Sequence, residues 1–495
     1  MTSHNTQRTM ASASAPTISD IVMMDALPLG QALRARRLSC VEVMNAYLDH
    51  IERFNPTVNA IISLRERKDL IAEAGQRDDQ FRRGEDMGPL HGMPQAIKDL
   101  AATKGLRTTQ GSPIFKDTVP SADALFVERM RKAGAIIIGK TNTPEFGLGS
   151  QTYNPVFGAT GNAYDPTKTS GGSSGGAAVA LALRMLPVAD GGDHAGSLRN
   201  PAAFNNVLGF RTSFGRVPQS GDDVFLPGLS VTGPMARTTA DLQMLLAVQS
   251  GYDDRVPLSI GDPHSYETPP LTGTMKGKRL GWIGDFGGHL PMEAGVLDLC
   301  RAALRTFETM GCIVEEVTPD FDPETIWKAW LVLRAWLQGS RLNAAYDNPA
   351  TRHLLKPEAQ WEVEQGKKLS AFDIMAASTT RSAWYQVVRS LFQHYDYLLL
   401  PSAQVFPFAK DTHWPKEIAG KRMDTYHRWM EVVIPVTMSG CPAISVPVGF
   451  NAAGLPMGMQ IVGPNRAEHA VLQLAHAYEL ATGWTSKVRP PLLTA

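Results

Sequence analysis

Two serines in glycine-rich surroundings are the residues of this chain best suited to chemistry. Ser173 lies in SGGSSGG at residues 170–176, and Ser197 follows 24 positions later in DHAGSLRNP at residues 193–201. Glycine lets backbone N–H groups come close to a ligand. A serine beside converging N–H groups is the minimum equipment for acyl transfer, because it supplies a nucleophile and a site for the oxyanion. This stretch therefore indicates a serine hydrolase, which needs a base from elsewhere in the chain.

A candidate base lies upstream of both serines. Lys98 stands near the end of HGMPQAIKD, the largely apolar run at residues 91–99. If this lysine were buried, desolvation would lower its pKa, and a neutral lysine can take a proton from a serine. The spacing alone favours a plainer interpretation, in which Lys98 is the solvated end of a strand.

Two other motif matches offer competing chemistry. GAIIIGKT at residues 134–141 fits a phosphate-binding loop, but such a loop follows a strand and opens a helix, whereas the apolar middle of this match is itself a predicted strand. GGSSG at residues 171–175 fits the nucleophile elbow of α/β-hydrolases, but YDPTKT before it predicts a turn and not the required strand. An α/β-hydrolase-like esterase, with Ser173 as nucleophile and His469 or His476 as base, stays an alternative.

The elements that must position these residues alternate between strands and helices. SCVE at residues 39–42 has the form of a capping box, within a predicted helical region at 27–54. Between the two serines we expect a helix of small residues at 174–186 and a buried strand at 186–189. Further helices are predicted at 124–133, 239–249, 292–310 and 468–480, and strands at 135–138, 279–283, 397–400, 443–448 and 457–462. This order indicates an α/β fold with helices covering a central sheet.

The segment from residue 323 to residue 414 breaks this alternation and is rich in aromatic residues. Six of the nine tryptophans lie in it: Trp327, Trp330, Trp336, Trp361, Trp384 and Trp414. The plainer explanation is that these rings pack a helical layer. The functional one is an aromatic wall over the substrate pocket, suited to aryl or larger apolar groups. On that hypothesis Trp327, Trp330 and Trp336 are candidate pocket residues, and Gln151, outside the segment, is a further candidate.

Composition excludes several classes of function. The chain has 495 residues, and its 48 basic and 48 acidic residues give a formal net charge of zero. This argues against nucleic acid or an anionic membrane surface as a partner. No stretch of eighteen apolar residues is present, so we expect no membrane span.

The cysteines and the first residues bear on the expected compartment. Cys40, Cys300, Cys312 and Cys441 show neither a C-x-x-C pair nor zinc spacing, so we expect buried free thiols in a reducing compartment, the cytoplasm. Residues 1–18 are rich in Ser, Thr and Ala without an apolar core. We therefore predict a flexible lead there and not a signal peptide, followed by a single domain at residues 19–495.

Several motifs together resemble the amidase signature family. They are GMPQAIKD at residues 92–99, GKTNTPEFG at 139–147, GGSSGG at 171–176, GSLR at 196–199, GCPAISVP at 440–447 and GLPMGMQ at 454–460. The resemblance runs from about residue 26 to about residue 484, and so many motifs in the right order are very unlikely to match by chance. It implies a mixed sheet of about ten strands covered by helices on both faces. Within the single domain it implies an N-terminal helical region (19–85), a signature core (86–320), a variable aromatic segment (321–415) and a C-terminal part of the core (416–495).

The resemblance also implies roles for individual residues. Ser197 corresponds to the nucleophile, Ser173 to a bridging serine that follows a cis peptide, and Lys98 to the base. The oxyanion would be held by the backbone N–H groups of His194, Ala195, Gly196 and Ser197. Relatives usually carry Gly at the position of Ala195, and a methyl group there is tolerated only at negative φ. Ser174, Asp193 and Arg199 are expected to support these groups from behind.

The implied function is hydrolysis of a neutral, medium-sized amide, anilide or carbamate, as in aryl acylamidases and urethanases. We expect no cofactor and no metal, a small-molecule substrate, and a monomer or homodimer. One alternative is the amidase subunit of a tRNA-dependent amidotransferase, although the Tyr-rich segment typical of such subunits is not found between residues 216 and 260. A binding protein on a retired amidase scaffold is disfavoured, because Lys98, Ser173 and Ser197 are all present.

Overall fold

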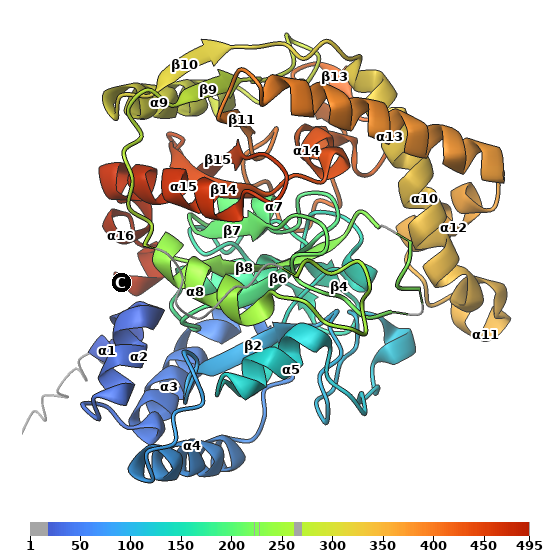
Figure 1. The fold of residues 1–495 in the computed structure, drawn as a ribbon. Coiled ribbons are helices and arrows are strands. Elements are labelled where there is room, and N and C mark those ends of the chain that lie inside the picture. The colour runs from blue at the N-terminus through green and yellow to red at the C-terminus, as the bar shows by residue number, and fades with distance from the viewer. Residues whose placement is uncertain (1–17, 222, 227, 262–269, 495) are drawn as a thin grey trace, which may run out of the picture.

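The computed structural model describes residues 18–221, 223–226, 228–261 and 270–494, and a mixed sheet of eight strands forms its centre (Figure 1). The strands are β1 (Ile61–Ile62), β2 (Pro94–Lys98), β3 (Ile136–Thr141), β4 (Tyr153–Asn154), β5 (Gly158–Ala159), β6 (Ala189–Asp193), β7 (Leu208–Arg211), β8 (Val231–Ala236), β9 (Arg279–Trp282), β10 (Ile313–Glu316), β11 (Tyr397–Pro401), β12 (Glu417–Ile418), β13 (Lys421–Arg422), β14 (Ala443–Phe450) and β15 (Pro456–Val462). The central sheet has the order β10-β9-β11-β15-β14-β7-β8-β6. Its β10–β9 and β9–β11 pairs are parallel, and its other pairs are antiparallel.

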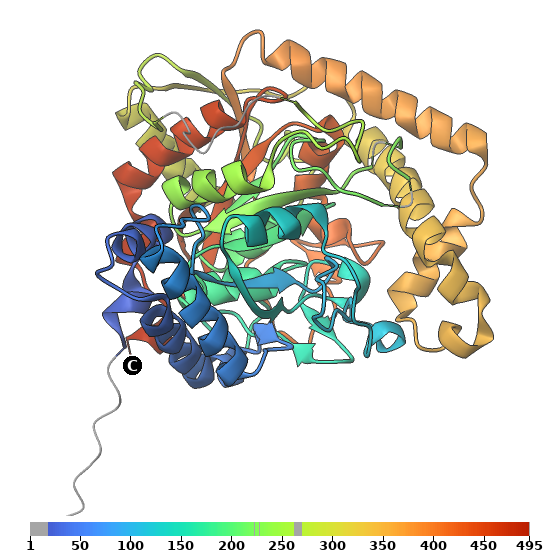
Figure 2. The same cartoon turned by 60° about the horizontal axis from the view of Figure 1, so that its bottom comes forward.

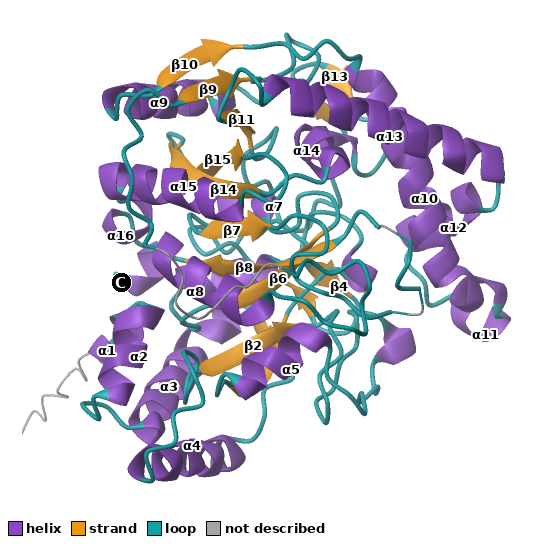
Figure 3. Ribbon diagram, viewed as in Figure 1, coloured by secondary structure: helices purple, strands orange, loops and turns teal. Residues whose placement is uncertain are grey.

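The helices flank these strands, as Figure 3 shows. They are α1 (Asp20–Met23), α2 (Ala26–Arg34), α3 (Cys40–Val58), α4 (Arg67–Arg82), α5 (Leu125–Lys132), α6 (Gly175–Ala182), α7 (Arg199–Phe204), α8 (Thr239–Gln249), α9 (Val296–Thr309), α10 (Pro323–Asp347), α11 (Pro349–Arg352), α12 (Pro357–Gly366), α13 (Ala371–Leu391), α14 (Ile434–Ser439), α15 (Glu468–Thr482) and α16 (Trp484–Lys487). Short 3-10 turns are η1 (Pro113–Phe115), η2 (Glu145–Gly147), η3 (Arg428–Val433) and η4 (Pro491–Leu493).

Helices cover both faces of the central sheet, and neighbouring residues of β7 show this. A methyl group added at Gly209 would point toward Leu198 and α7. The side chain of the preceding residue, Leu208, instead lies near Tyr478 of α15. Successive side chains of a strand point to opposite faces, so α7 and α15 lie on opposite sides. The predicted fold class, a mixed central sheet with helices on both faces, is confirmed.

A smaller sheet, β1-β3-β2, lies beside the β6 edge of the central sheet. The resemblance implied about ten strands in one sheet, and the structure divides the strands between these two sheets. One reason lies at their junction. The backbone N–H of Lys98 in β2 donates to both carboxylate oxygens of Asp190 at 3.3 Å, so a side chain of β6 takes the place of a ladder partner.

The larger part of the segment predicted at residues 323–414 forms a helical layer, which ends before β11, so Trp414 lies outside it. The chain leaves the sheet after β10, builds α10, α11, α12 and α13, and returns at β11. Figures 1 and 2 both show this layer along one side of the molecule, with α10 and α13 as long helices. The packing interpretation of the aromatic segment is confirmed, since α10 lies against α12, α13 and α14.

Most predicted elements are present, and one is displaced. Ser39 and Glu42 form the expected capping box of α3, and all four cysteines are buried and free. The strand expected at residues 186–189 instead occupies Ala189–Asp193, whose Gly-Gly centre has low strand propensity and is held by pairing with β8. The predicted lead, residues 1–18, lies outside the described residues except for Ile18. None of the helices in the described part of the chain is long and apolar enough to cross a membrane.

Candidate active site

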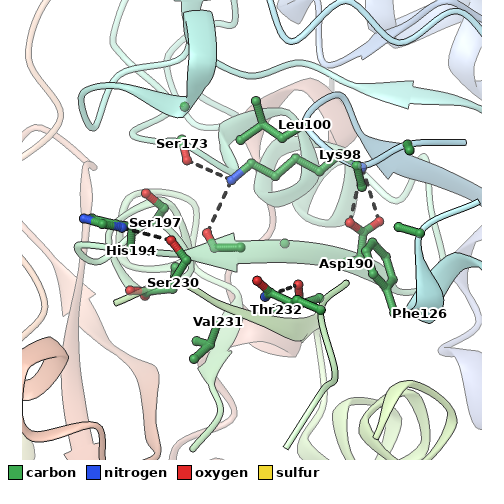
Figure 4. Close-up of a pocket in the computed structure, with 18 of the residues that line it drawn as sticks. Lys98, Leu100, Phe126, Ser173, Asp190, His194, Ser197, Ser230, Val231 and Thr232 are labelled. Atoms are coloured by element: carbon green, nitrogen blue, oxygen red, sulfur yellow. Dashed lines mark hydrogen bonds between the residues drawn. The ribbon is translucent and has the colours of Figure 1, made fainter. Parts of the chain in front are cut away.

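Three separate elements bring the predicted catalytic residues together. Lys98 is the last residue of β2, and Ser173 lies in the loop just before α6. Ser197 lies in the turn between β6 and α7. All three residues line one cavity, which encloses about 570 Å³, and Figure 4 shows their side chains facing one another there.

The Lys98 ammonium is buried among neutral oxygen atoms. Its Nζ donates to Ser173 Oγ and Ser174 Oγ, both at 2.8 Å, and to the carbonyl oxygen of Gly192 at 3.3 Å. Only 3% of the residue is exposed, so the solvated strand end favoured by spacing alone is wrong. Burial lowers the pKa of Lys98 to about 7, although the carboxylates of Asp190 and Asp193 act in the opposite direction. A large fraction of the side chain is therefore a neutral amine at neutral pH.

The two serines face the cavity without a bond between them. The Gly172–Ser173 peptide is cis, as the resemblance implied. No hydrogen bond joins Ser173 Oγ to Ser197 Oγ among the described residues, whereas the backbone N–H of Ser174 donates to the carbonyl oxygen of Ser197 at 3.2 Å. The backbone around both residues is thus fixed, and the Ser197 hydroxyl stays available to the cavity.

Asp193 organises the turn that carries Ser197. Its carboxylate accepts from the backbone N–H of Gly196 at 2.9 Å and of Leu198 at 3.2 Å, and it also binds the guanidinium groups of Arg199 and Arg211. Burial alone would raise the pKa of Asp193, but these two arginines hold it well below its usual range. The predicted supporting role of Asp193 and Arg199 therefore has a physical basis, a buried ionic lock on the turn.

The same contacts refine the predicted oxyanion site. The N–H of Gly196 is engaged by Asp193, whereas no acceptor is found within the described structure for the N–H groups of Ala195 and Ser197. Ala195 is not among the residues with positive φ, so its methyl group is accommodated without strain. These two N–H groups, with that of His194, for which the described residues offer no acceptor either, stay the candidates for oxyanion donors.

His194 lies on the cavity wall and makes no side-chain hydrogen bond to Ser173 or Ser197 in the described structure. Its Nδ1 is 2.9 Å from Ser230 Oγ, and its Nε2 is buried without a hydrogen-bond partner in the described part of the chain. Burial, followed by the nearby guanidinium groups of Arg334 and Arg211, holds the pKa of His194 well below its usual value. The imidazole is therefore neutral.

The competing motif interpretations do not fit this geometry. His469 and His476 lie on α15, outside the cavity lining, and His476 Nδ1 is 2.7 Å from Thr239 Oγ1. The GKT of the phosphate-loop match belongs to β3 itself, and the Lys140 ammonium donates to the carbonyl oxygen of Ala101. Neither the α/β-hydrolase interpretation nor a phosphate site is supported.

The cavity has two chemically different sides. One is formed by Ala101, Ala122, Ala124, Leu125 and Phe126, with the carboxylates of Asp123 and Asp190 among them. The other is polar and is formed by His194 together with Arg334, Gln338 and Arg341 of α10. In Figure 4, His194 and Phe126 lie on opposite sides of the Lys98 ammonium.

The structure does not place the four candidate pocket residues in this cavity: neither Gln151 nor the three tryptophans of the aromatic segment, Trp327, Trp330 and Trp336, lines it. Trp327 and Trp330 are fully buried at the other end of the same α10 face, where both rings pack against His427. Trp336 is half-buried against the core, and Gln151 Nε2 donates to the carbonyl oxygen of Thr412. Tryptophan density indicated the helical layer correctly, but it did not show which residues of the layer face the cavity.

Sequence reasoning missed the polar residues of the cavity wall. Arg334, Gln338 and Arg341 are spaced at i, i+4 and i+7 on one helix, which places them on one face. That spacing was visible in the sequence, but nothing local indicated that this face meets a cavity.

Asp190 was also missed. Burial raises its pKa to about 6, although the Lys98 N–H and the Lys140 and Lys98 charges act in the opposite direction.

One other cluster in the described residues offers ligand atoms close enough together for a metal ion: His289, Glu324 and Glu431. It lies outside the cavity, and the Arg428 guanidinium is 2.6 Å from Glu324 and 2.8 Å from Glu431. Both carboxylates already pair with this one guanidinium, so the cluster is part of an ion-pair network.

Comparison with known proteins decides the family. The family model for amidases matches residues 42–472, most of the chain. The chain belongs to the amidase family. It is 31% identical to an acylamidase of Rhodococcus erythropolis over 95% of this chain and 98% of that protein. It is 32% identical to one of the subunits of the glutamyl-tRNA(Gln) amidotransferase of Methylococcus capsulatus, over 93% of this chain and 97% of that protein.

A solved structure gives the same result for the fold. A bacterial aryl acylamidase of the amidase signature family superposes with a TM-score of 0.87 at 28% identity, covering 94% of this chain and 98% of the other. The resemblance found in the sequence motifs is thereby confirmed. This amidase is an enzyme that hydrolyses amide bonds.

Proposed function

We propose that this amidase cleaves C–N bonds through an acyl-enzyme on Ser197, with Ser173 and Lys98 as a proton relay. The observation that carries the proposal is the buried Lys98 ammonium, 2.8 Å from Ser173 Oγ, with a pKa lowered to about 7 by burial. A base with a pKa near the working pH is the most effective kind.

The reaction follows in two halves. Neutral Lys98 takes the proton of Ser173, and Ser173 takes that of Ser197 as the Ser197 oxygen attacks the carbonyl carbon. The oxyanion is stabilised by the N–H groups of Ala195 and Ser197, each worth about 3 kcal/mol. The proton then passes back through Ser173 to the departing nitrogen, the C–N bond breaks, and an acyl-enzyme and a free amine result. Water repeats the sequence on the acyl-enzyme and releases the acid.

The two serine hydroxyls must come into contact for this relay. Both face the same cavity, and a serine side chain has three staggered positions. We place the Ser197–Ser173 hydrogen bond in the substrate complex, because catalytic hydrogen bonds often form fully only there.

The proposed substrates are medium-sized amides, anilides or carbamates. The size of the cavity and the apolar residues in its lining, Leu100 and Phe126 among them, support this class. An acylamidase among the relatives and an aryl acylamidase among the similar structures also support it.

A second candidate function is the amidase subunit of a tRNA-dependent amidotransferase. Relatives named as subunits of such an enzyme cover nearly the whole chain at 31–32% identity, comparable to the acylamidase. The two functions differ in their need for a partner. A free-standing amidase hydrolyses anilides as purified, whereas an amidotransferase subunit would release ammonia from glutamine and depend on a partner protein for transfer.

The nucleophile assignment is tested by covalent labelling. The purified chain should react stoichiometrically with a serine-directed fluorophosphonate, and Ser197→Ala should lose both labelling and amide turnover with its fold intact. Ser230→Ala is the matched control, because Ser230 lines the same cavity outside the relay. Retained labelling in Ser197→Ala, with loss in Ser173→Ala, would show that Ser173 is the nucleophile.

A further inference from the structure

The polar side of the cavity holds a cation without a carboxylate partner. Arg334 and Arg341 both reach the cavity from α10, but their surroundings differ. Arg334 Nε is 2.6 Å from Glu362, and its other arm donates to the Tyr426 hydroxyl at 2.7 Å. Arg341 donates to the carbonyl oxygen of Phe146 at 2.8 Å and has no carboxylate oxygen within 4.0 Å in the described structure. A guanidinium has five N–H donors, so most of those on Arg341 stay available.

The acids that line the cavity are already engaged elsewhere. Asp123 pairs with Arg131, and Asp190 accepts from the backbone N–H of Lys98. Asp193 binds Arg199 and Arg211. None of these three carboxylates neutralises Arg341, so the α10 side of the cavity has an uncompensated positive charge.

On this side of the cavity, two further side chains each have one buried polar atom without a hydrogen-bond partner among the described residues. Gln338, one helical turn before Arg341, is 9% exposed, and its Oε1 is buried without a hydrogen-bond partner in the described part of the chain. His194 Nε2 is unpartnered in the same way. Buried polar atoms are nearly always hydrogen-bonded, so this arrangement is typical of a surface that binds a polar ligand group.

We infer that Arg341, assisted by the Gln338 amide, binds a carboxylate of the substrate. The inference rests on the proposed function and narrows it. The substrate is an amide or carbamate with a carboxylate on one side of the scissile bond and an apolar or aryl group on the other, toward Phe126. A guanidinium matches a carboxylate through two parallel hydrogen bonds. The inferred substrate therefore differs from the neutral one expected from the sequence. No sequence motif had indicated a cation in the cavity.

Matched substrate pairs test the inference. The first series consists of anilides of straight-chain dicarboxylic acids with two to five methylenes, each paired with the neutral alkyl anilide of equal length. The second places the carboxylate on the amine side, as in 4-acylaminobenzoates paired with plain anilides. In one series kcat/KM should favour the carboxylated member by about 10- to 100-fold, the range expected for a charge-assisted hydrogen bond. The preference should peak at one chain length.

Variants then assign the preference to its residue. Arg341→Gln should lose the preference, with kcat/KM falling clearly more for the carboxylated member of each pair than for the neutral one, and Arg341→Lys should keep part of the preference. Lys328→Gln is the matched control, because it removes an exposed cation of the same helix. Calorimetric binding of the same pairs to Ser197→Ala gives a second readout, which does not need turnover.

The outcomes separate the inference from the proposed function. Equal kcat/KM within every pair, or an equal loss on both members in Arg341→Gln, would overturn the carboxylate site and leave the amidase mechanism standing. Failure to hydrolyse any member would contradict the proposed substrates. In that case, tighter calorimetric binding of the carboxylated member that disappears in Arg341→Gln still supports the site, and its absence overturns it.

Discussion

At the scale of single residues, the chemistry depends on the surroundings of one amine. Lys98 ends a strand of which every residue is buried, and its ammonium meets two hydroxyls and one carbonyl oxygen with no directly bonded carboxylate. Desolvation therefore outweighs the attraction of Asp190 and Asp193, and the pKa falls from 10.5 to about 7. The same lysine in water would be protonated and useless as a base.

The pH dependence of activity should report this pKa. The neutral amine is the active form and becomes more abundant as the pH rises. We therefore expect kcat/KM for an anilide to rise about tenfold per pH unit below about 7 and to level off above it. His194→Gln should keep the same midpoint, since burial already keeps that imidazole neutral in this range. Asp190→Asn should move the midpoint down, because it removes a charge that stabilises the ammonium. A profile without a step between pH 6 and pH 8.5 would contradict this role of Lys98.

The relay also predicts a difference between amides and esters. An amine leaves poorly unless it is protonated, whereas an alkoxide or phenoxide needs less help. Lys98→Ala should therefore lower kcat/KM by about 10²- to 10⁴-fold on an anilide and clearly less on the matched phenyl ester. Ser197→Ala is the reference, because it should abolish both activities. Equal losses on amide and ester in Lys98→Ala would argue against proton return through this residue.

The residues of the site show what a sequence can and cannot predict. Ser173, Ser197 and Lys98 were found through motifs, and the structure brings all three to one cavity. Spacing alone placed Lys98 in solvent, because its burial depends on Ser174 and Gly192, which are distant in sequence. The tryptophans were placed in the pocket because composition does not show which part of a helix face meets a cavity. Arg341 was missed for the same reason.

At the scale of elements, close approach of backbones holds the nucleophile turn on the sheet. A methyl group added at Gly209 of β7 would lie 2.2 Å from the carbonyl oxygen of Leu198, the residue after Ser197. One added at Gly233 of β8 would lie 2.1 Å from the carbonyl oxygen of Phe210. Gly209 thus lets the backbone of the turn lie directly on β7, and the Leu198 side chain packs over Gly191 and Gly233, so the sheet positions the turn that carries Ser197.

Gly209→Ala should therefore displace the turn. Because the clash is with backbone, we expect a loss of stability of about 1–3 kcal/mol, typical of overpacking, and at least a tenfold slower reaction of Ser197 with a fluorophosphonate. Gly75→Ala is the matched control, since Gly75 lies within α4 and an added methyl group meets nothing closer than 4.0 Å. That change should stabilise the protein by about 0.5–1 kcal/mol. The measurements are thermal unfolding and labelling rate, and an unchanged rate in Gly209→Ala would show that the turn does not depend on this contact.

At the scale of the whole molecule, the proposed catalytic residues and the proposed carboxylate site lie on different parts of the fold. The two sheets and their loops carry Lys98, Ser173 and Ser197, whereas the helical layer between β10 and β11 carries Arg334, Gln338 and Arg341 of the cavity wall. The class of the fold followed from the alternating strands and helices. The division into two sheets did not, because it depends on the Asp190 carboxylate at the junction. The layer is held by a buried polar cluster, in which Arg334 and the Tyr426 hydroxyl both donate to Glu362 Oε1.

This cluster gives the layer a stability that can be tested separately from the sheet. Glu362→Gln keeps an oxygen acceptor but leaves the Arg334 guanidinium, which is 3% exposed, without its counter-charge. Removing one partner of a buried ion pair costs about 3 kcal/mol or more. Hydrogen exchange should therefore become about 100-fold faster in α10 and α12, with unchanged protection in β7, β14 and β15, since cooperative units can open separately. Glu364→Gln is the control, because Glu364 lies on the same helix, is exposed and only contacts the Tyr346 hydroxyl. Faster exchange throughout the sheet in Glu362→Gln would mean that layer and sheet unfold as one unit, and selectivity could then not be altered without altering the catalytic site.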